Sequence, residues 1–329
     1  MVDNLKCPSY QIGMSKLKSE RHHWWPECVS KYWADDGGGL HWLLPSLEVR
    51  RSTPSNFGVI GNGHHIKLGD DPEIGSVWDE SYEAEFSTAD GNFPGIIDWL
   101  DSLNRCDPPF EALIAKRIQH QTVQDGQFRL LIECLVSLAA RSPMQREKSV
   151  SLAEHFSGPL PEQKRNSLIG ANSRHSLRNA VRGLGGSGKA MAIFSPEREF
   201  IFGDGFFHNL TINGEHWNHP KMLVPLTPWL CVLFVRPIGY RTEPKLVTLV
   251  ASSQETNALN FAAKVYARNA LFFRSEKPDV GDEFTCGRHK IFADHRNSVD
   301  DFIHHIPGVP PRDPSLDFIA DFLAETSRK

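Results

Sequence analysis

The stretch RHHWWPECVSKYW (residues 21–33) decides how the rest of this chain is organised. It places three tryptophans, a tyrosine, two histidines and a glutamate in one short segment. Large aromatic side chains bury much area and need fixed partners. We therefore expect this segment to be pinned against the body of the fold, with its histidines and Glu27 held where their chemistry is usable.

The composition is that of a soluble globular protein with a sizeable core. The chain has 329 residues, of which 40% are apolar and 23% charged. A net charge of −4 excludes a protein that coats nucleic acid with its whole surface, so such a partner would need a local basic patch. No apolar run approaches the ~18 residues of a membrane span. Residues 1–20 lack the apolar middle of a signal peptide, so we predict a cytoplasmic protein with no membrane partner.

The six cysteines are widely spaced and include no Cys-x-x-Cys pair. A disulfide framework or a zinc ribbon needs closer spacing. We expect reduced thiols in or near the core, and a Cys28–histidine nucleophile is the minor alternative.

Helical spacing of apolar residues dominates the first half of the chain. A short strand is expected at 40–44 and mostly loop at 45–71. The apolar spacing then predicts helices from about 75 to 89, at 94–103 and at 110–123. The most apolar helix is expected at 127–140, followed by one that ends near 156.

Short apolar runs replace this pattern after Gly158. They are 190–194, 199–202, 222–224, 230–235 and 245–251, and a last helix is expected at 254–273. Helices followed by strands predict an α+β fold, here a helical bundle packed with a small, mainly antiparallel sheet. We expect one domain at 21–275, between a flexible leader at 1–20 and a C-terminal extension at 276–329.

Six motifs occur along the chain in a recognisable order. They are His23-Trp24-Trp25-Pro26 through Trp33, Trp78-Asp79-Glu80 with Glu83, Arg141-Ser142-Pro143 with Arg146, Phe202-Gly203-Asp204-Gly205, Pro225-Leu226-Thr227-Pro228, and a helix with Asn257, Asn260 and Ala262. In this order the chain resembles the bacterial domain-of-unknown-function family four-two-three-eight, over about residues 21–275. The first and fifth motifs are the most specific.

The fourth motif departs from the family pattern. The family has Ser-Asp-Asn-Pro at the end of a strand, and here only Asp204 is kept. The resemblance implies positions to watch but no reaction, because the family is uncharacterised.

A first candidate site combines histidine and carboxylates from distant parts of the sequence. We predict a catalytic group of His23, Glu27, Glu83 and Asp204. His22 is the alternative to His23, and Glu80 is the alternative to Glu83. Within it, His23, Glu83 and Asp204 would hold a divalent metal ion, since imidazole and carboxylate are metal ligands and also common acid–base groups. The alternative is that His23 and Asp204 brace the backbone at turns.

A second candidate site is a basic stripe. Arg174, Arg178 and Arg182 are four residues apart on one helix face, close to Lys189. They are predicted to bind phosphates, including those of a nucleic acid. The alternative is an exposed, solvated helix face.

Three other patterns are weaker. The run from Gly183 to Lys189 resembles a phosphate-binding loop, but a helix precedes it and a strand follows, so we expect a glycine-rich connector. His208, His216 and His219 have spacing that fits a metal, within what looks like a polar hairpin loop. Arg141 and Arg146 are expected to pair with carboxylates or to bind an anion.

Two functions fit these patterns. One is a metal-assisted hydrolase that acts on phosphodiesters. The other is a non-catalytic binding or regulatory module, in which the aromatic segment is structural and the arginines bind a partner.

Overall fold

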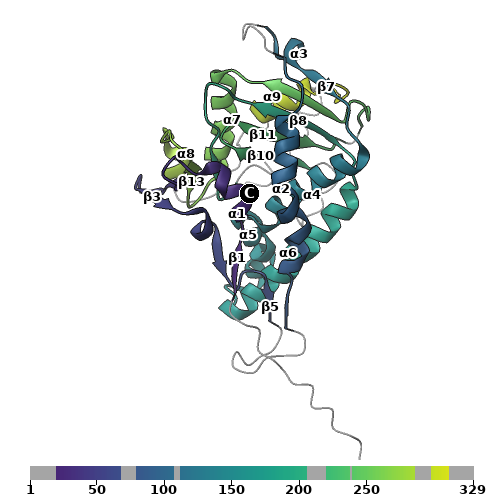
Figure 1. Cartoon of the computed structure of the whole chain (residues 1–329). Helices are drawn as coiled ribbons and strands as arrows, with labels where there is room; N and C mark the ends of the chain where they lie inside the picture. Colours follow the sequence, from purple (N-terminus) through teal and green to yellow (C-terminus); the bar gives the residue numbers. More distant parts are fainter. Residues whose placement is uncertain are drawn as a thin grey trace, which may run out of the picture.

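The protein has an α+β fold, as the sequence predicts. The computed structural model describes residues 20–67, 79–106, 112–205, 220–237, 239–285 and 298–310. One end of the molecule is built around a buried sheet, and long helices lie along the side and below it (Figure 1). The candidate site lies at the opposite end, around β1 and β5.

The main sheet has five strands in the order β10-β11-β8-β12-β7. They are β7 (Gln119–Gln121), β8 (Lys189–Phe194), β10 (Lys221–Thr227), β11 (Leu230–Val235) and β12 (Leu246–Val250). β8 and β12 are parallel and the other pairs are antiparallel. Every residue of β8 and β11 is buried, which explains why these strands are continuous apolar runs in the sequence.

A second sheet has the order β3-β2-β13-β9. It contains β2 (Leu40–Leu43), β3 (Val49–Ser52), β9 (Phe202–Gly203) and β13 (Leu271–Phe273). The predicted helix at 254–273 is therefore too long, because α7 (Ser253–Tyr266) ends first and the last residues form β13. The Asp204 carboxylate accepts the backbone N–H groups of Arg268 and Asn269, which holds the turn between helix and strand.

Four helices form the helical layer: α2 (Ser87–Asp101), α4 (Asp125–Arg141), α5 (Pro143–Ser157) and α6 (Glu162–Leu184). The predictions for α4 and α5 are confirmed. Residues 75–78 of the first predicted helix lie outside the described residues. From residue 79 to 103 a single helix, α2, with Pro94 inside it, follows the short 3₁₀ turn η3 (Glu83–Phe86) in place of the two predicted. The predicted helix at 110–123 is wrong, since from residue 112, where the description resumes, only α3 (Ile114–Arg117) is helical before β7.

Two small antiparallel strand pairs are formed within residues 21–81. β1 (Arg21–His23) pairs with β4 (Val59–Gly61), and β5 (His65–Ile66) pairs with β6 (Glu80–Ser81). The expectation of mostly loop at 45–71 therefore misses three short strands. Helix α6 packs closely on β5, because a Cβ at Gly170 would lie 2.9 Å from the His65 carbonyl oxygen.

The aromatic segment is pinned as expected. It forms α1 (Glu27–Ser30) and η1 (Lys31–Trp33) after β1, and Trp25 stacks on Phe202 with ring centroids 4.2 Å apart. The Trp33 indole donates a 3.0 Å hydrogen bond to the carbonyl of Leu226. The two most specific motifs of the family resemblance are therefore in contact.

Beyond residue 275 the chain forms α8 (Asp282–Thr285) and α9 (Ser298–His305). Helix α9 contributes Val299, Phe302 and Ile303 to the main core. In the described ranges, no helix combines the length and apolar character that crossing a membrane requires.

Candidate functional site

Strand β1 separates its two histidines. Successive side chains of a strand point to opposite faces, and here His22 is buried whereas His23 is partly exposed. His23 Nδ1 lies 3.0 Å from the Phe57 carbonyl oxygen. The inward-facing imidazole is therefore His22, one residue before the predicted one.

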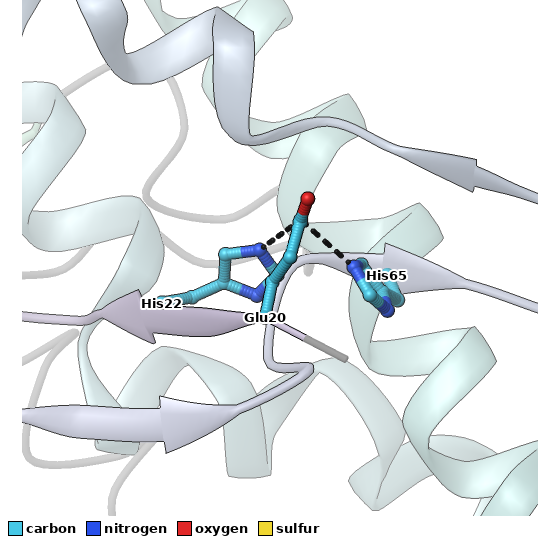
Figure 2. A group of neighbouring side chains, drawn as sticks. All are labelled: Glu20, His22 and His65. Atoms are coloured by element: carbon cyan, nitrogen blue, oxygen red, sulfur yellow. Dashed lines mark hydrogen bonds and ion pairs between the residues drawn. The ribbon is translucent and has the colours of Figure 1, made fainter. Parts of the chain in front are cut away.

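Glu20, His22 and His65 form a first cluster (Figure 2). One carboxylate oxygen of Glu20 lies 3.0 Å from His22 Nε2 and 3.1 Å from His65 Nε2. Both imidazoles are buried, while the Glu20 side chain is 49% exposed. Hydrogen bonds from His65 and His22 hold the pKa of Glu20 below its ordinary value. Glu20 is thus an ionised carboxylate at the edge of the protein, fixed by two buried rings.

The hydrogen bonds of His22 determine its tautomer. Its Nδ1 accepts the backbone N–H of His64 at 2.9 Å, so this nitrogen carries a lone pair. The proton of the neutral ring must then be on Nε2, which donates to Glu20. His22 is therefore a donor that orients Glu20, and neither of its nitrogens is free to bind a metal.

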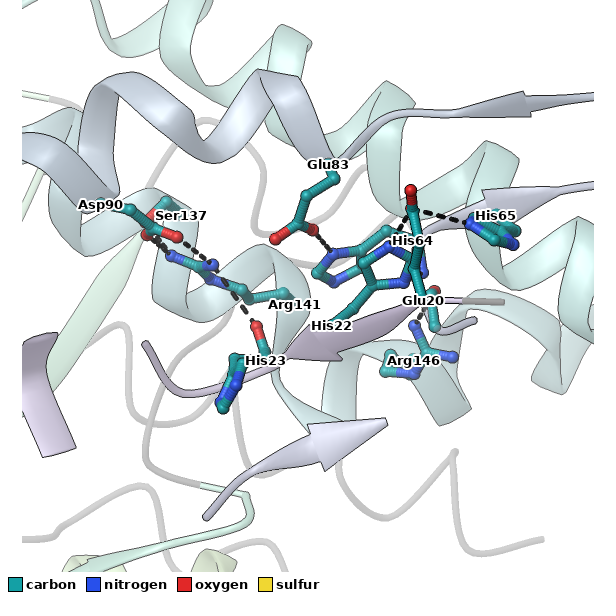
Figure 3. Close-up of polar contacts among 11 residues, drawn as sticks. Glu20, His22, His23, His64, His65, Glu83, Asp90, Ser137, Arg141 and Arg146 are labelled. Atoms are coloured by element: carbon teal, nitrogen blue, oxygen red, sulfur yellow. Dashed lines mark hydrogen bonds and ion pairs between the residues drawn. The ribbon is translucent and has the colours of Figure 1, made fainter. Parts of the chain in front are cut away.

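His22, His64 and Glu83 form a second cluster (Figure 3). The rings of His22 and His64 stack with centroids 4.9 Å apart, and His64 Nδ1 contacts the Glu83 carboxylate. Burial lowers the pKa of His64 to about 4 although Glu83 opposes this, so His64 is neutral near pH 7. Burial also disfavours the charged form of Glu83, but the hydrogen bond from His64, together with nearby groups that include the Arg141 guanidinium, brings the pKa of Glu83 below its ordinary value.

A pocket of about 470 Å³ adjoins the first cluster. It lies between residues 60–67 and the first turns of α6, and its lining includes His65, Lys67, Arg146 and Glu162. Ser167 on α6 fixes Lys67, because its hydroxyl accepts the Lys67 N–H at 3.2 Å and donates to the Lys67 carbonyl. The pocket therefore places two cationic side chains beside one of the clustered histidines.

Arg146 differs from the other largely buried arginines. Arg117 and Arg141 each make a two-pronged ion pair, with Glu255 and Asp90 respectively. Arg146 donates to the Gly63 carbonyl at 2.8 Å, and in the part of the chain that the structure describes it pairs with no carboxylate. Burial lowers the pKa of Arg146, since its guanidinium is withdrawn from water without a counter-charge.

The predicted triad of His23, Glu83 and Asp204 is not assembled. Across the described ranges, only the two clusters above bring three potential ligand atoms within 4.8 Å of one another, and only Glu83 of the triad belongs to one. Both oxygens of Asp204 accept hydrogen bonds from residues 268 and 269, so it braces a turn. Glu27 pairs with Lys31 on the protein surface at 3.4 Å. The alternative structural reading of Asp204 is thus the correct one.

The basic stripe is largely neutralised. Arg174 contacts Glu80 and Glu85, Arg178 contacts Glu85, and Arg182 is exposed further along α6. Lys189 is fully buried at the start of β8, and its ammonium group donates to the carbonyls of residues 241 and 242. These four residues do not form one cationic surface. In the pocket lining, by contrast, Lys67 and Arg146 form no ion pair with any carboxylate of the described residues.

The weaker patterns have structural roles where they are described. Helix α6 ends at Leu184 and β8 begins at Lys189, which confirms the glycine-rich connector. The Cys28 thiol donates to the Asp90 carbonyl, and burial raises its pKa, which argues against a nucleophile. His208, His216 and His219 lie outside the described residues.

Sequence reasoning missed Glu20, His64 and His65 as site residues. One signal was present, because two of the three His-His pairs in the chain, at 22–23 and 64–65, contribute the rings that the structure brings together. No protein-family model, curated protein or solved structure matches the chain, so the family resemblance stays a prediction.

Proposed function

We propose that this protein is a metal-assisted hydrolase of phosphate esters, phosphodiesters included, in which Glu20 and His65 hold a divalent ion. The observation that carries the proposal is the approach of the Glu20 carboxylate to His65 Nε2, at 3.1 Å, beside a cationic pocket. An ion about 2.1 Å from each ligand in octahedral geometry places neighbouring ligand atoms about 3 Å apart. The distance between the Glu20 oxygen and His65 Nε2 fits that spacing, and the ion would replace the hydrogen bond between them.

Supporting contacts suit this assignment. Carboxylates that bind metals are themselves usually hydrogen-bonded by a second layer of residues. His22 has that role, because its Nε2–H donates to Glu20 while the His64 N–H fixes its tautomer. Glu83 in turn orients His64. The half-exposed carboxylate leaves room for water and for a substrate oxygen, the arrangement that Mg²⁺ and Mn²⁺ commonly adopt with few protein ligands.

The chemistry divides between the ion and the chain. A bound divalent ion supplies polarisation of the phosphoryl oxygen and a lowered pKa of water. Lys67 and Arg146 stabilise negative charge on the other phosphate oxygens. The buried rings of His22 and His65 keep Glu20 in one position and exclude water from its inner side.

The second candidate is a non-catalytic binding module. It is favoured by one observation, namely that two histidine donors already satisfy Glu20 through hydrogen bonds. This module would bind its ligand in the pocket without converting it.

Turnover of bis(p-nitrophenyl) phosphate with Mn²⁺ or Mg²⁺ separates the two candidates. We expect metal-dependent release of nitrophenol that falls about 100-fold in Glu20→Gln and in His65→Gln, because one ligand is lost in each. His23→Gln is the matched control, since His23 is adjacent in sequence but faces away from the cluster. No turnover with any divalent ion, or equal turnover in all three variants, would exclude the hydrolase.

A further inference from the structure

We infer that Arg146 and Lys67 form an oxyanion site that holds a phosphate group of a small phosphorylated ligand. Its role as a substrate subsite rests on the proposed function, whereas phosphate binding itself does not require the ion. The stripe on α6 has no part in this site.

Arg146 has more hydrogen-bond donors than the described residues around it satisfy. A guanidinium has five N–H donors. Arg146 donates to the Gly63 carbonyl at 2.8 Å, and its other described neighbours include the neutral phenol of Tyr82 and the positive charge of Arg165. Buried charges in proteins are normally paired, as Arg117 and Arg141 are here. The exception lies in the wall of the pocket, which is where a ligand would complete the pairing.

A second cationic residue, Lys67, lines the same pocket from a different element. Lys67 follows β5 and is held to α6 through both its N–H and its carbonyl, so its backbone position is fixed. Within the described ranges no carboxylate forms an ion pair with Lys67. Glu162 is the acidic side chain in the pocket lining, and it is exposed at the start of α6.

The N-terminal end of α6 lies at the pocket. Its first turn lines the same pocket, and its N-cap residue, Pro161, supplies no side-chain cap. The N-terminus of a long helix carries a partial positive charge and favours anions. Arginine, lysine and a helix end therefore converge on one space from three elements.

The size of the pocket limits the ligand. A volume of about 470 Å³ is in the range of small-molecule sites. Such a space accepts a phosphorylated metabolite or a mononucleotide, while a nucleic-acid duplex would need an extended surface. Arginine favours phosphate because its planar fork can donate two hydrogen bonds to one group.

Calorimetric titration with inorganic phosphate in EDTA tests the site without any ion. We expect saturable binding to the wild type, weakened about tenfold in Arg146→Gln and several-fold in Lys67→Gln, because each removes a charge-assisted hydrogen bond. Arg178→Gln is the matched control, since Arg178 is an arginine on the surface of α6 already paired with Glu85. It should bind phosphate as the wild type does. If Arg146→Gln folds poorly, the phosphate affinities of Lys67→Gln and Arg178→Gln still test the site. Weaker binding by Lys67→Gln alone supports it, and equal binding by both overturns it.

Two results would overturn the inference: no phosphate binding by the wild type, or equal binding by all variants. A short oligonucleotide that binds more tightly than a mononucleotide, and whose binding depends on Arg178 rather than Arg146, would also overturn it. The hydrolase proposal fails separately. Phosphate binding that depends on Arg146, without metal-dependent turnover, keeps the anion site and removes the enzyme. Metal-dependent turnover without phosphate binding at Arg146 keeps the enzyme and removes the anion site.

Discussion

Arg141 and Arg146 lie on either side of the α4–α5 junction and have opposite surroundings. Arg141 is 1% exposed, contacts both oxygens of Asp90 and lies over the Phe86 ring. Arg146, the fourth residue of the next helix, has no carboxylate partner among the described residues and lines the pocket. Figure 3 shows the two side chains on opposite sides of the histidine cluster. Arg141 belongs to a buried structural ion pair with Asp90, whereas Arg146 retains the capacity to bind an anion.

The helix junction explains this difference. Helix α4 ends at Arg141, and α5 begins at Pro143. Ser142 between them caps α5, because its hydroxyl accepts the Gln145 N–H. The change of helix direction sends Arg141 toward α2 and Arg146 toward Gly63. The contrast can be tested by measuring what each charge contributes to the free energy of unfolding.

Asp90→Asn should be the most destabilising. It leaves the Arg141 guanidinium buried without a counter-charge, which costs about 3 kcal/mol. Urea denaturation gives this value directly. A loss below about 1 kcal/mol would mean that Arg141 does not depend on Asp90.

Lys189 extends the comparison to a buried lysine. Burial lowers its pKa from 10.5 to about 8. Between pH 8 and 10.5 the unfolded chain then binds more protons than the folded one, so the free energy of unfolding should rise with pH, by roughly 1–3 kcal/mol. The rise should disappear in Lys189→Met. Parallel pH profiles for the two proteins would show that Lys189 stays solvated.

Arg146→Met should change the free energy of unfolding by less than about 1 kcal/mol in phosphate-free buffer, because no ion pair is broken. The difference from the wild type should widen when phosphate is added, since only the wild type gains binding energy. A loss as large as that of Asp90→Asn would make Arg146 a structural residue.

Arg178→Gln should have the smallest effect, below about 0.5 kcal/mol, because an exposed ion pair contributes little. The Arg178 side chain is 54% exposed in its pair with Glu85. Thermal unfolding at low and high salt checks this value. A large, salt-insensitive loss would indicate that the α6 stripe is part of the fold.

The sequence predicts the fold better than the site. Strands β8 and β11 and helix α4 were recognisable, because long apolar runs with one period leave few alternatives. The end of α7 could not be recognised, because the turn that follows it is held by Asp204, which lies 64 residues before Arg268 in the sequence. The hairpin strands β4 and β5 are too short to show a period.

The site depended on details that spacing does not contain. To choose His22 over His23, one must know which side chains of the three-residue strand β1 face inward. Glu20, Lys67 and Arg146 come from separate elements, and only the fold brings them to one place. The paired histidines and the arginine after Pro143 were visible in the sequence, but their partners were not.

Anomalous diffraction at the manganese edge, from crystals grown with MnCl₂ and inorganic phosphate, tests the central claim most directly. The account predicts a manganese peak bonded to Glu20 and His65 Nε2, with a phosphate within hydrogen-bonding distance of Arg146. A peak on His22 or Asp204, or Glu20 still hydrogen-bonded to both histidines with no manganese beside it, would contradict the account.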